Sequence, residues 1–231
     1  MRKFVTILIA FLLINGLNSL YAQTVDDVIN KYIDALGGAE KVKGIKSLYQ
    51  EGVTVMQNGN ELTIKSWKVQ DKLYRNEFQF GMGAVTTIIT DKEGWRSNPR
   101  NGGAFEAIPA DRVKSQQFEL DINPLVDYAA KGHTVELVGK EAVNGVECYK
   151  LKLTPKSGNA ITYYIDPNTW YLVRETRTGG GGMGGPGGGG GGGQQRPGGG
   201  DGTFNRDFSN YQKTESGYVF PFTVSMGGPG S

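Results

Sequence analysis

The sequence contains only one cysteine, Cys148, and one histidine, His133, among its 231 residues. A single cysteine cannot form an internal disulfide, so burial alone must hold the fold together. Metal sites built from clusters of cysteine and histidine are excluded, and a serine–histidine–aspartate triad would have to use His133. That histidine follows Gly132 at the start of a predicted strand, which favours a structural role. The sequence therefore predicts no metal, no cofactor and no catalytic residue, and a hydrolase is the least favoured function.

The chain also lacks a surplus of charge of one sign. It has 25 basic and 23 acidic residues, and two of the basic ones belong to the leader segment described next, so 25 − 2 = 23 basic residues balance 23 acidic ones. Binding to a nucleic-acid backbone requires clustered Lys and Arg side chains. No basic run is present, so we do not expect nucleic acid to be a partner.

A hydrophobic run occurs at the N-terminus, where residues 1–22 have the features of a cleaved signal peptide. The segment begins with two basic residues, continues through an apolar run at 4–17 and ends on the Leu-Tyr-Ala of 20–22. The run is short for a bilayer core of about 30 Å, and the residue that follows is not a cysteine that could carry a lipid anchor. We therefore expect cleavage near Ala22 and an exported, periplasmic protein that is not an integral membrane protein.

Most of the remaining chain has the two-residue periodicity of β-strands. At residues 147–153, for example, Tyr149, Leu151 and Leu153 alternate with Cys148 and two lysines, which gives one apolar and one largely polar face. Asparagine–glycine pairs at 58–59 and 144–145 are typical of tight hairpin turns. We predict three or four short strands within residues 135–174, among them 147–153, 163–165 and 170–173. Further strands are predicted at residues 47–56, 61–70, 73–80, 84–90, 105–108, 203–213 and 217–225, the last of them at a sheet edge because it contains Pro221.

Helices are predicted at the start and in the middle of the chain. Residues 24–36 have apolar side chains at helical spacing, a capping Thr24, and two aspartates in the first turn. A further short turn is predicted at 39–43. In the middle, residues 109–120 and 123–130 interrupt the strands with two more helical segments, the second with a proline at its first position.

Residues 179–202 contain 17 glycines in 24 positions. Glycine loses the most conformational entropy on ordering and offers no side chain to bury. We therefore predict a disordered glycine-rich loop, inserted into a single domain that spans 23–231. Its chance G-x-G-x-x-G matches do not follow a strand into a helix, which argues against a phosphate-binding role.

The order of these elements resembles the LolA/LolB-like superfamily of periplasmic lipoprotein-sorting and lipid-carrier proteins. The segments that carry the resemblance lie at 71–75, 91–95, 139–145, 164–169 and 218–222, where the sequence is DKLYR, DKEGW, GKEAVNG, YIDPNT and YVFPF. The resemblance implies a mainly β (α+β) fold, in which a strongly curved antiparallel sheet forms an incomplete β-barrel with an N-terminal helix and a central helical lid. It also implies a non-enzymatic carrier or binder of lipid or lipoprotein acyl chains in outer-membrane lipoprotein sorting.

A set of apolar residues forms the candidate ligand site. We predict that an apolar cavity is lined by Trp67, Tyr74, Phe78, Phe80, Trp95, Tyr149, Leu151, Tyr163 and Phe220. Burial of each methylene group contributes about 0.8 kcal/mol, so an acyl chain can bind in such a groove without a recognisable polar motif. The alternative is that the same residues fill an ordinary core. The protein would then be an envelope scaffold or interaction module with a protein partner, and the sequence leaves both interpretations open.

Overall fold

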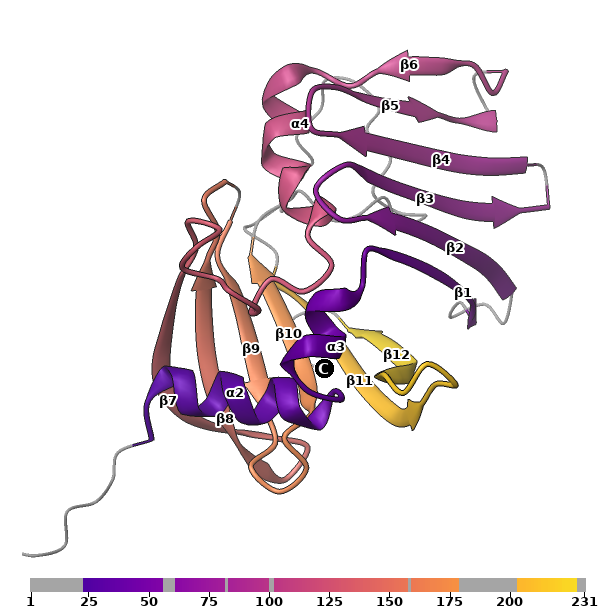
Figure 1. The fold of residues 1–231 in the computed structure, drawn as a ribbon. Helices are drawn as coiled ribbons and strands as arrows, with labels where there is room; N and C mark the ends of the chain where they lie inside the picture. Colours follow the sequence, from indigo (N-terminus) through magenta and orange to yellow (C-terminus); the bar gives the residue numbers. More distant parts are fainter. Residues whose placement is uncertain are drawn as a thin grey trace, which may run out of the picture.

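The computed structural model of the protein describes residues 23–55, 61–81, 83–99, 102–157, 159–178 and 203–227. The strands in these ranges form two six-stranded antiparallel sheets, each a simple meander (Figure 1). Sheet A consists of β1 (Ser47–Val55), β2 (Glu61–Val69), β3 (Leu73–Phe80), β4 (Gly83–Thr90), β5 (Gly94–Ser97) and β6 (Phe105–Ala107). Sheet B consists of β7 (Thr134–Val143), β8 (Val146–Thr154), β9 (Ile161–Ile165), β10 (Leu172–Thr178), β11 (Thr203–Lys213) and β12 (Val219–Gly227).

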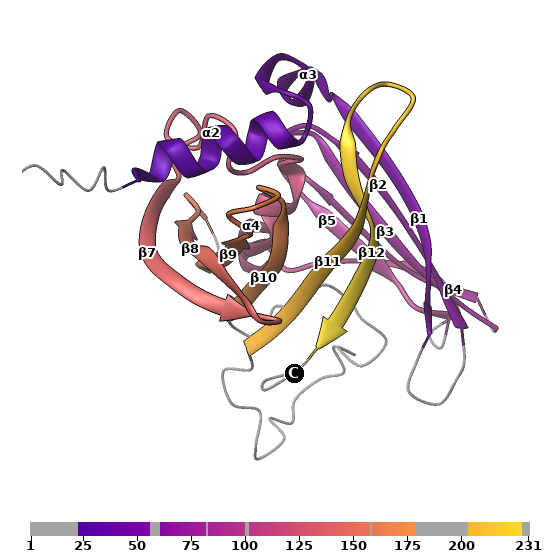
Figure 2. The ribbon, with the colours of Figure 1, turned by 90° about the horizontal axis from the view of Figure 1, so that it is seen from below.

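The two sheets curve around a shared interior without closing on each other (Figure 2). In the described residues, β1 pairs only with β2, and β12 pairs only with β11, so both are edge strands. This confirms the predicted mainly β fold with an incomplete barrel, and it places Pro221 in an edge strand as expected. The predicted signal peptide, the turn at 58–59 and the glycine-rich loop at 179–202 lie outside the described residues.

The N-terminal helix α2 (Val25–Ala35) begins and ends where the sequence predicts. The Thr24 hydroxyl accepts a hydrogen bond from the backbone N–H of Asp27 at 3.2 Å, and the Asp27 carboxylate accepts one from the backbone N–H of Thr24 at 2.9 Å. This reciprocal capping box satisfies two N–H groups that the helix leaves free. Gly37, at φ +119°, then ends the helix, and α3 (Ala39–Gly44) follows as the predicted short turn.

Tight turns set the register of sheet B. Asn144 and Gly145 have φ angles of +50° and +83°, as the predicted type I′ hairpin between β7 and β8 requires. After β9, the Asp166 carboxylate accepts a hydrogen bond from the backbone N–H of Asn168 at 2.8 Å, which forms the predicted turn. The strand predicted from residue 170 begins later, because Trp170 adopts a φ of +61° and belongs to the turn.

The central helical segment α4 (Ala110–Gln116) continues into the 3₁₀ turn η2 (Gln117–Leu120), and together they match the helix predicted at 109–120. We call this segment the lid. Leu120 packs in a cluster with side chains of sheet A, whereas Phe118 joins a cluster with side chains of sheet B. The lid therefore lies between the two sheets, and the face of each sheet that contacts these clusters is called its inner face (Figures 1 and 2).

The second predicted helix, at 123–130, is wrong. The chain forms successive turns there, because Asp127 adopts a φ of +51°, a conformation that an α-helix cannot contain. The apolar residues of the segment are nevertheless buried, since Leu125 and Val126 pack into the cluster beneath α2. The hydroxyl of Tyr128 donates a hydrogen bond to Asp26 at 2.9 Å, which fastens the turns to the first turn of α2.

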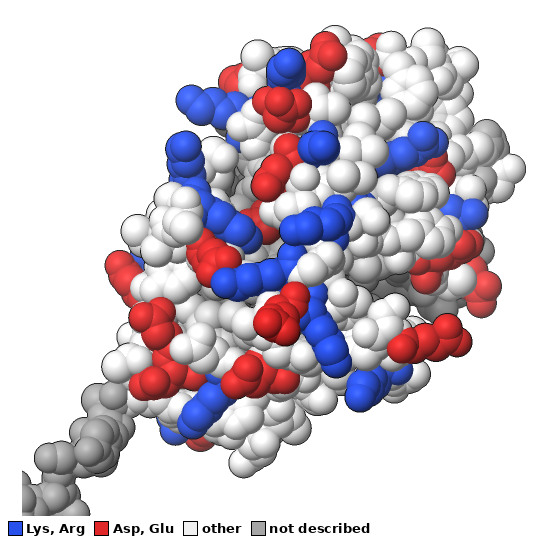
Figure 3. All heavy atoms as spheres, viewed as in Figure 1, with Lys and Arg blue, Asp and Glu red and all other residues white. Residues whose placement is uncertain are grey.

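Two further expectations concern the distribution of charge on the surface and the presence of a membrane-spanning helix. Basic and acidic side chains are interspersed over the face of the molecule seen in Figure 3. None of the helices in the described ranges has both the length and the apolar character needed to cross a bilayer.

Candidate functional site

The inner face of sheet A is covered by the lid. Tyr74 of β3 and Ile89 of β4 are buried against Val113 and Leu120 of the lid. Because side chains alternate along a strand, the residues of β3 on this face are Tyr74 and its alternate neighbours, and one of these, Phe78, is also buried. Tyr74 and Phe78 therefore share the inner face of β3, and the lid packs on part of it.

The inner face of sheet B is covered by α2 and by the lid. Leu151 and Tyr163 are cross-strand neighbours on β8 and β9, and both are buried in the same cluster as Ile29 and Ile33 of α2. Phe118 of the lid belongs to this cluster as well. The space between the sheets is thus occupied by the protein's own apolar side chains, and two separate elements, α2 and the lid, supply them.

Five charged side chains also lie in the interior, and we call them the ion network. Its members are Lys68 of β2, Glu119 of the lid, Glu175 and Arg177 of β10, and Arg206 of β11; each side chain is less than a quarter exposed. The Glu119 carboxylate accepts hydrogen bonds from Arg177 and, at 3.5 Å, from the Lys68 ammonium. Glu175 accepts hydrogen bonds from Arg177 and, at 2.7 Å, from Arg206. Glu119 therefore connects the lid to both sheets at once.

The electrostatics of the ion network favour ionised carboxylates. Burial alone would raise the pKa of Glu119, but attraction to Arg177, Lys68 and Arg206 outweighs it and lowers the pKa to about 2. Burial opposes ionisation of Glu175 in the same way, and the neighbouring arginines again lower its pKa. For Lys68, burial is the largest effect and lowers the pKa of the ammonium, although Glu119 partly compensates.

One buried polar atom near this interior has no hydrogen-bond partner. The Oδ1 of Asn76 on β3 is inaccessible to solvent, and the residue as a whole is 5% exposed. Asn76 is two residues from both Tyr74 and Phe78 along β3, so it lies with them on the inner face of sheet A. Buried polar groups are normally paired, so an unpaired acceptor on this face indicates a position where a donor from water or a ligand would be stabilised.

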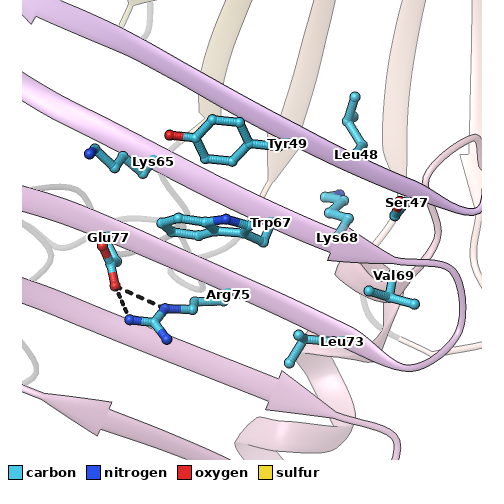
Figure 4. A pocket seen from close by; sticks show the side chains of 10 residues that line it. All are labelled: Ser47, Leu48, Tyr49, Lys65, Trp67, Lys68, Val69, Leu73, Arg75 and Glu77. Carbon is cyan, nitrogen blue, oxygen red and sulfur yellow. Dashed lines mark hydrogen bonds and ion pairs between the residues drawn. The ribbon is translucent and has the colours of Figure 1, made fainter.

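The outer face of sheet A carries a separate open groove of about 600 Å³. Tyr49, Trp67 and Arg75 are cross-strand neighbours on β1, β2 and β3, and they form a row across the groove (Figure 4). The rings of Tyr49 and Trp67 lie 5.1 Å apart, and the Arg75 guanidinium lies 5.3 Å from the Trp67 ring. Arg75 also forms an ion pair with Glu77, so the floor of this groove is aromatic and its rim is charged.

The nine residues predicted to line one cavity do not share one face. Trp67 and Trp95 lie on the outer face of sheet A. They pair with Arg75 and Ile88, which also pair with each other, and the sequence neighbours of that pair, Tyr74 and Ile89, lie on the inner face. The inner faces hold five of the others, namely Tyr74, Phe78, Tyr149, Leu151 and Tyr163. Phe220 lies on the edge strand β12, close to Leu36 and Val42 of the first two helices. The side chain of Phe80 lies outside the described residues, and the role of the whole set in ligand binding stays a prediction.

The ion network was missed by the sequence reasoning. Its members are two glutamates, two arginines and a lysine in strands and a helix with no motif around them, and such residues are usually exposed. No local signal marks them: on β2 the residue predicted to line the cavity is Trp67, and its neighbour Lys68 points to the opposite face of the strand.

His133 and Cys148 are both held in structural positions. The Nδ1 of His133 accepts a hydrogen bond from the backbone N–H of Lys156 at 3.0 Å, and its Nε2 lies 3.7 Å from Asp121. Burial, the largest effect, lowers the pKa of His133. Cys148 is buried, and burial raises the pKa of its thiol, which disfavours the reactive thiolate. Among the described residues, no three His, Cys, Asp or Glu side chains are grouped to hold a metal ion.

Comparison with known proteins supports the fold. The sequence matches no protein-family model and no curated protein sequence. Its structure is similar to that of a LolA superfamily protein from Nitrosomonas europaea, with a TM-score of 0.52 and 10% identity over 90% of this chain and 87% of that one. It is also similar to a DUF1329 family protein from Desulfovibrio piger, with a TM-score of 0.52 and 12% identity over 90% and 88% of the two chains. The chain therefore has a LolA-like fold.

Proposed function

We propose that this protein is a non-enzymatic periplasmic binding protein that carries an acyl chain of a lipid or lipoprotein between its two sheets. The observation that carries the proposal is the placement of the lid. It is a short segment between two apolar inner faces, and its most connected polar side chain is Glu119, which pairs with one cation from each sheet. Movement of the lid would uncover Tyr74 and Ile89 on one side and the cluster around Tyr163 on the other.

Burial of an acyl chain of ordinary length recovers about as much free energy as the loss of the lid's apolar contacts costs. The lid buries three apolar side chains between the sheets, Val113, Phe118 and Leu120. At about 1.5–3 kcal/mol each, their removal costs about 5–9 kcal/mol. An acyl chain of about twelve methylene groups recovers about 10 kcal/mol when it is buried in their place. A long chain can therefore offset the loss of the lid's apolar contacts, whereas a short chain cannot.

The proposed periplasmic location rests on the predicted signal peptide and not on the folded domain. A basic start, an apolar run at 4–17 and a small-residue cleavage site favour export to the periplasm. An acyl carrier is needed in an aqueous compartment between two membranes, because an acyl chain is costly to expose to water. The fold, which is LolA-like, is compatible with this role.

Lipid analysis of the purified protein tests the proposal. The mature chain is isolated from the bacterial envelope under non-denaturing conditions and examined by native mass spectrometry and by solvent extraction. We expect an acyl-containing ligand to co-purify, or a fluorescent fatty acid to bind the emptied protein in a saturable way. Absence of both results would contradict the proposal.

A second candidate function is an envelope interaction module that binds a protein partner. It is favoured by the edge strand β12, where Phe222 and Val224 are 59% and 47% exposed, because an open edge with apolar side chains can accept a further strand. Changing Phe222 and Val224 to aspartate would then abolish partner capture in envelope cross-linking. Thr223→Asp, on the other face of the same strand, is the matched control. An unchanged cross-linking profile in the double variant would reject this function.

A further inference from the structure

The ion network between the sheets carries unequal numbers of positive and negative charges. Lys68, Arg177 and Arg206 contribute three positive charges, and Glu119 and Glu175 contribute two negative ones, which leaves 3 − 2 = +1. The same five groups are the charged side chains that act on the ionisation of Glu119, Glu175 and Lys68. A net charge in a poorly solvated interior is unfavourable unless something compensates for it.

The least satisfied member of the network is Lys68. Its ammonium has three N–H donors, and the hydrogen bond described for it is a single long contact of 3.5 Å to Glu119. Its second neighbour is the face of the Tyr74 ring, 5.2 Å from the nitrogen. Lys68 also lies on the inner face of sheet A, on the strand next to Tyr74 and beside the lid. A buried cation with spare donors therefore faces the space that the lid occupies.

Displacement of the lid would increase the imbalance. Glu119 leaves with the lid, so the remaining groups carry 3 − 1 = +2. A neutral acyl chain fills the vacated apolar volume but leaves Lys68 without its ion-pair partner and Arg177 paired with Glu175 alone. A ligand that ends in an anionic group supplies both the apolar volume and the missing negative charge. Its head takes the position of the Glu119 carboxylate, and its chain replaces the apolar side chains of the lid.

We propose that the ligand of this interior is an anionic amphiphile whose carboxylate or phosphate head binds Lys68 and Arg177 in place of Glu119. This proposal rests on the proposed acyl-chain binding and specifies the chemical class of its ligand. In the closed form Glu119 acts as an internal substitute for the head group. Fatty acids and phosphate-headed lipids share the required negative charge, and both differ from neutral glycerides and alcohols.

Affinity measurements on matched ligands test the proposal. Dodecanoate, dodecyl phosphate and dodecanol have the same chain and differ in the head, and each is titrated against delipidated protein by competition with a neutral fluorescent acyl probe. Because a hydrogen bond to a charged group is worth about 1.5–3 kcal/mol, we expect at least one of the two anions to bind about tenfold or more tightly than the alcohol. The tighter of the two anions identifies the head group.

Variants of Lys68 locate the effect. Lys68→Met should reduce the preference for the anion over the alcohol to about threefold or less, and Lys68→Arg, which keeps the charge, should retain it. Lys65→Gln is the control, because Lys65 lies on the same strand but on the outer face, where it pairs with Glu51. If Lys68→Met does not fold, the wild-type ratio and the Lys68→Arg variant still decide the question.

The possible outcomes separate the two proposals. Equal affinity for anions and alcohol in the wild-type protein, or a preference that survives in a folded Lys68→Met variant, would overturn the anionic-head proposal while leaving acyl-chain binding intact. If none of the three ligands nor the neutral probe binds, acyl-chain binding itself fails.

Discussion

Glu119 of the lid and Arg177 of β10 are 58 residues apart in the sequence, and Nη1 of Arg177 donates a hydrogen bond to the Glu119 carboxylate. The other oxygen of that carboxylate faces Lys68 of sheet A at 3.5 Å. One side chain therefore holds the lid against both sheets. This arrangement explains how a segment of eleven residues, 110–120, with few buried apolar side chains, keeps a fixed place in the interior.

Removal of the Glu119 charge should destabilise the protein strongly. In Glu119→Gln the interior retains three cations and one anion, and an uncompensated buried charge typically costs about 3–5 kcal/mol. We expect a loss of about 3 kcal/mol in the free energy of unfolding, measured by urea denaturation. The double variant Glu119→Gln/Lys68→Met should recover part of this loss, because it removes one of the excess cations. Additive effects of the two substitutions would show that the residues are not coupled.

The exposed ion pair of Glu51 and Lys65 provides the control for this experiment. It lies on the outer face of sheet A, with the carboxylate side chain about half exposed. Surface pairs contribute little because solvent screens them, so Glu51→Gln should leave the urea midpoint close to that of the wild type.

Acid should abolish the contribution of Glu119 in a defined pH range. Its pKa in the folded protein is about 2, below the ordinary value of 4.5. A lowered folded pKa means that the stabilisation is fully present above about pH 4.5 and is lost as the pH falls through about 2. The difference in unfolding free energy between wild type and Glu119→Gln should therefore be constant from pH 7 to pH 5 and shrink below pH 4.5. A difference that grows on acidification would contradict this assignment.

Ligand affinity should depend steeply on chain length. If the acyl chain replaces the buried side chains of the lid, each added methylene contributes about 0.8 kcal/mol, or about a fourfold gain in affinity. A saturated fatty acid of six carbons should then show no measurable binding, whereas chains of twelve to sixteen carbons should bind. A series of fatty acids titrated by competition gives the slope. An affinity independent of chain length would place the ligand on the surface instead.

Residues on the inner and outer faces of the sheets should behave differently when they are changed. Trp67→Ala on the outer face should leave fatty-acid uptake within about twofold of wild type. Leu151→Ala on the inner face of sheet B should lower the unfolding free energy by about 2–5 kcal/mol, because Leu151 is fully buried and its loss leaves a cavity. Loss of uptake in a folded Trp67→Ala variant would instead make the outer groove the ligand site.

Local patterns predicted most of the elements, because their causes are local. The capping box of Thr24 and Asp27, the turn at Asn144-Gly145 and the alternation in β3 and β8 each depend on residues within a few positions of one another. The prediction of a helix at 123–130 was wrong for a reason that local patterns do not contain. Burial of Leu125 and Val126 beneath α2 and the left-handed φ of Asp127 are consequences of tertiary packing.

The site was only partly predictable for the same physical reason. Alternation shows that Tyr74 and Phe78 share a face, but it does not show that Trp67, on the neighbouring strand, points the other way, since that depends on the register between β2 and β3. The ion network joins residues from β2, η2, β10 and β11, whose sequence separations exceed fifty residues for the contacts of Glu119. Such pairs leave no periodicity in the sequence.

Locking the lid tests most directly whether ligands enter by displacing it. Ile89 of β4 and Val113 of the lid belong to one buried cluster, so cysteines are introduced at these two positions in a Cys148→Ala background and oxidised to form a disulfide across the contact. Fluorescent fatty-acid uptake is then measured on the reduced and the cross-linked forms of the same protein. The account predicts saturable uptake by the reduced form and none by the cross-linked form. Equal uptake by both forms would contradict it.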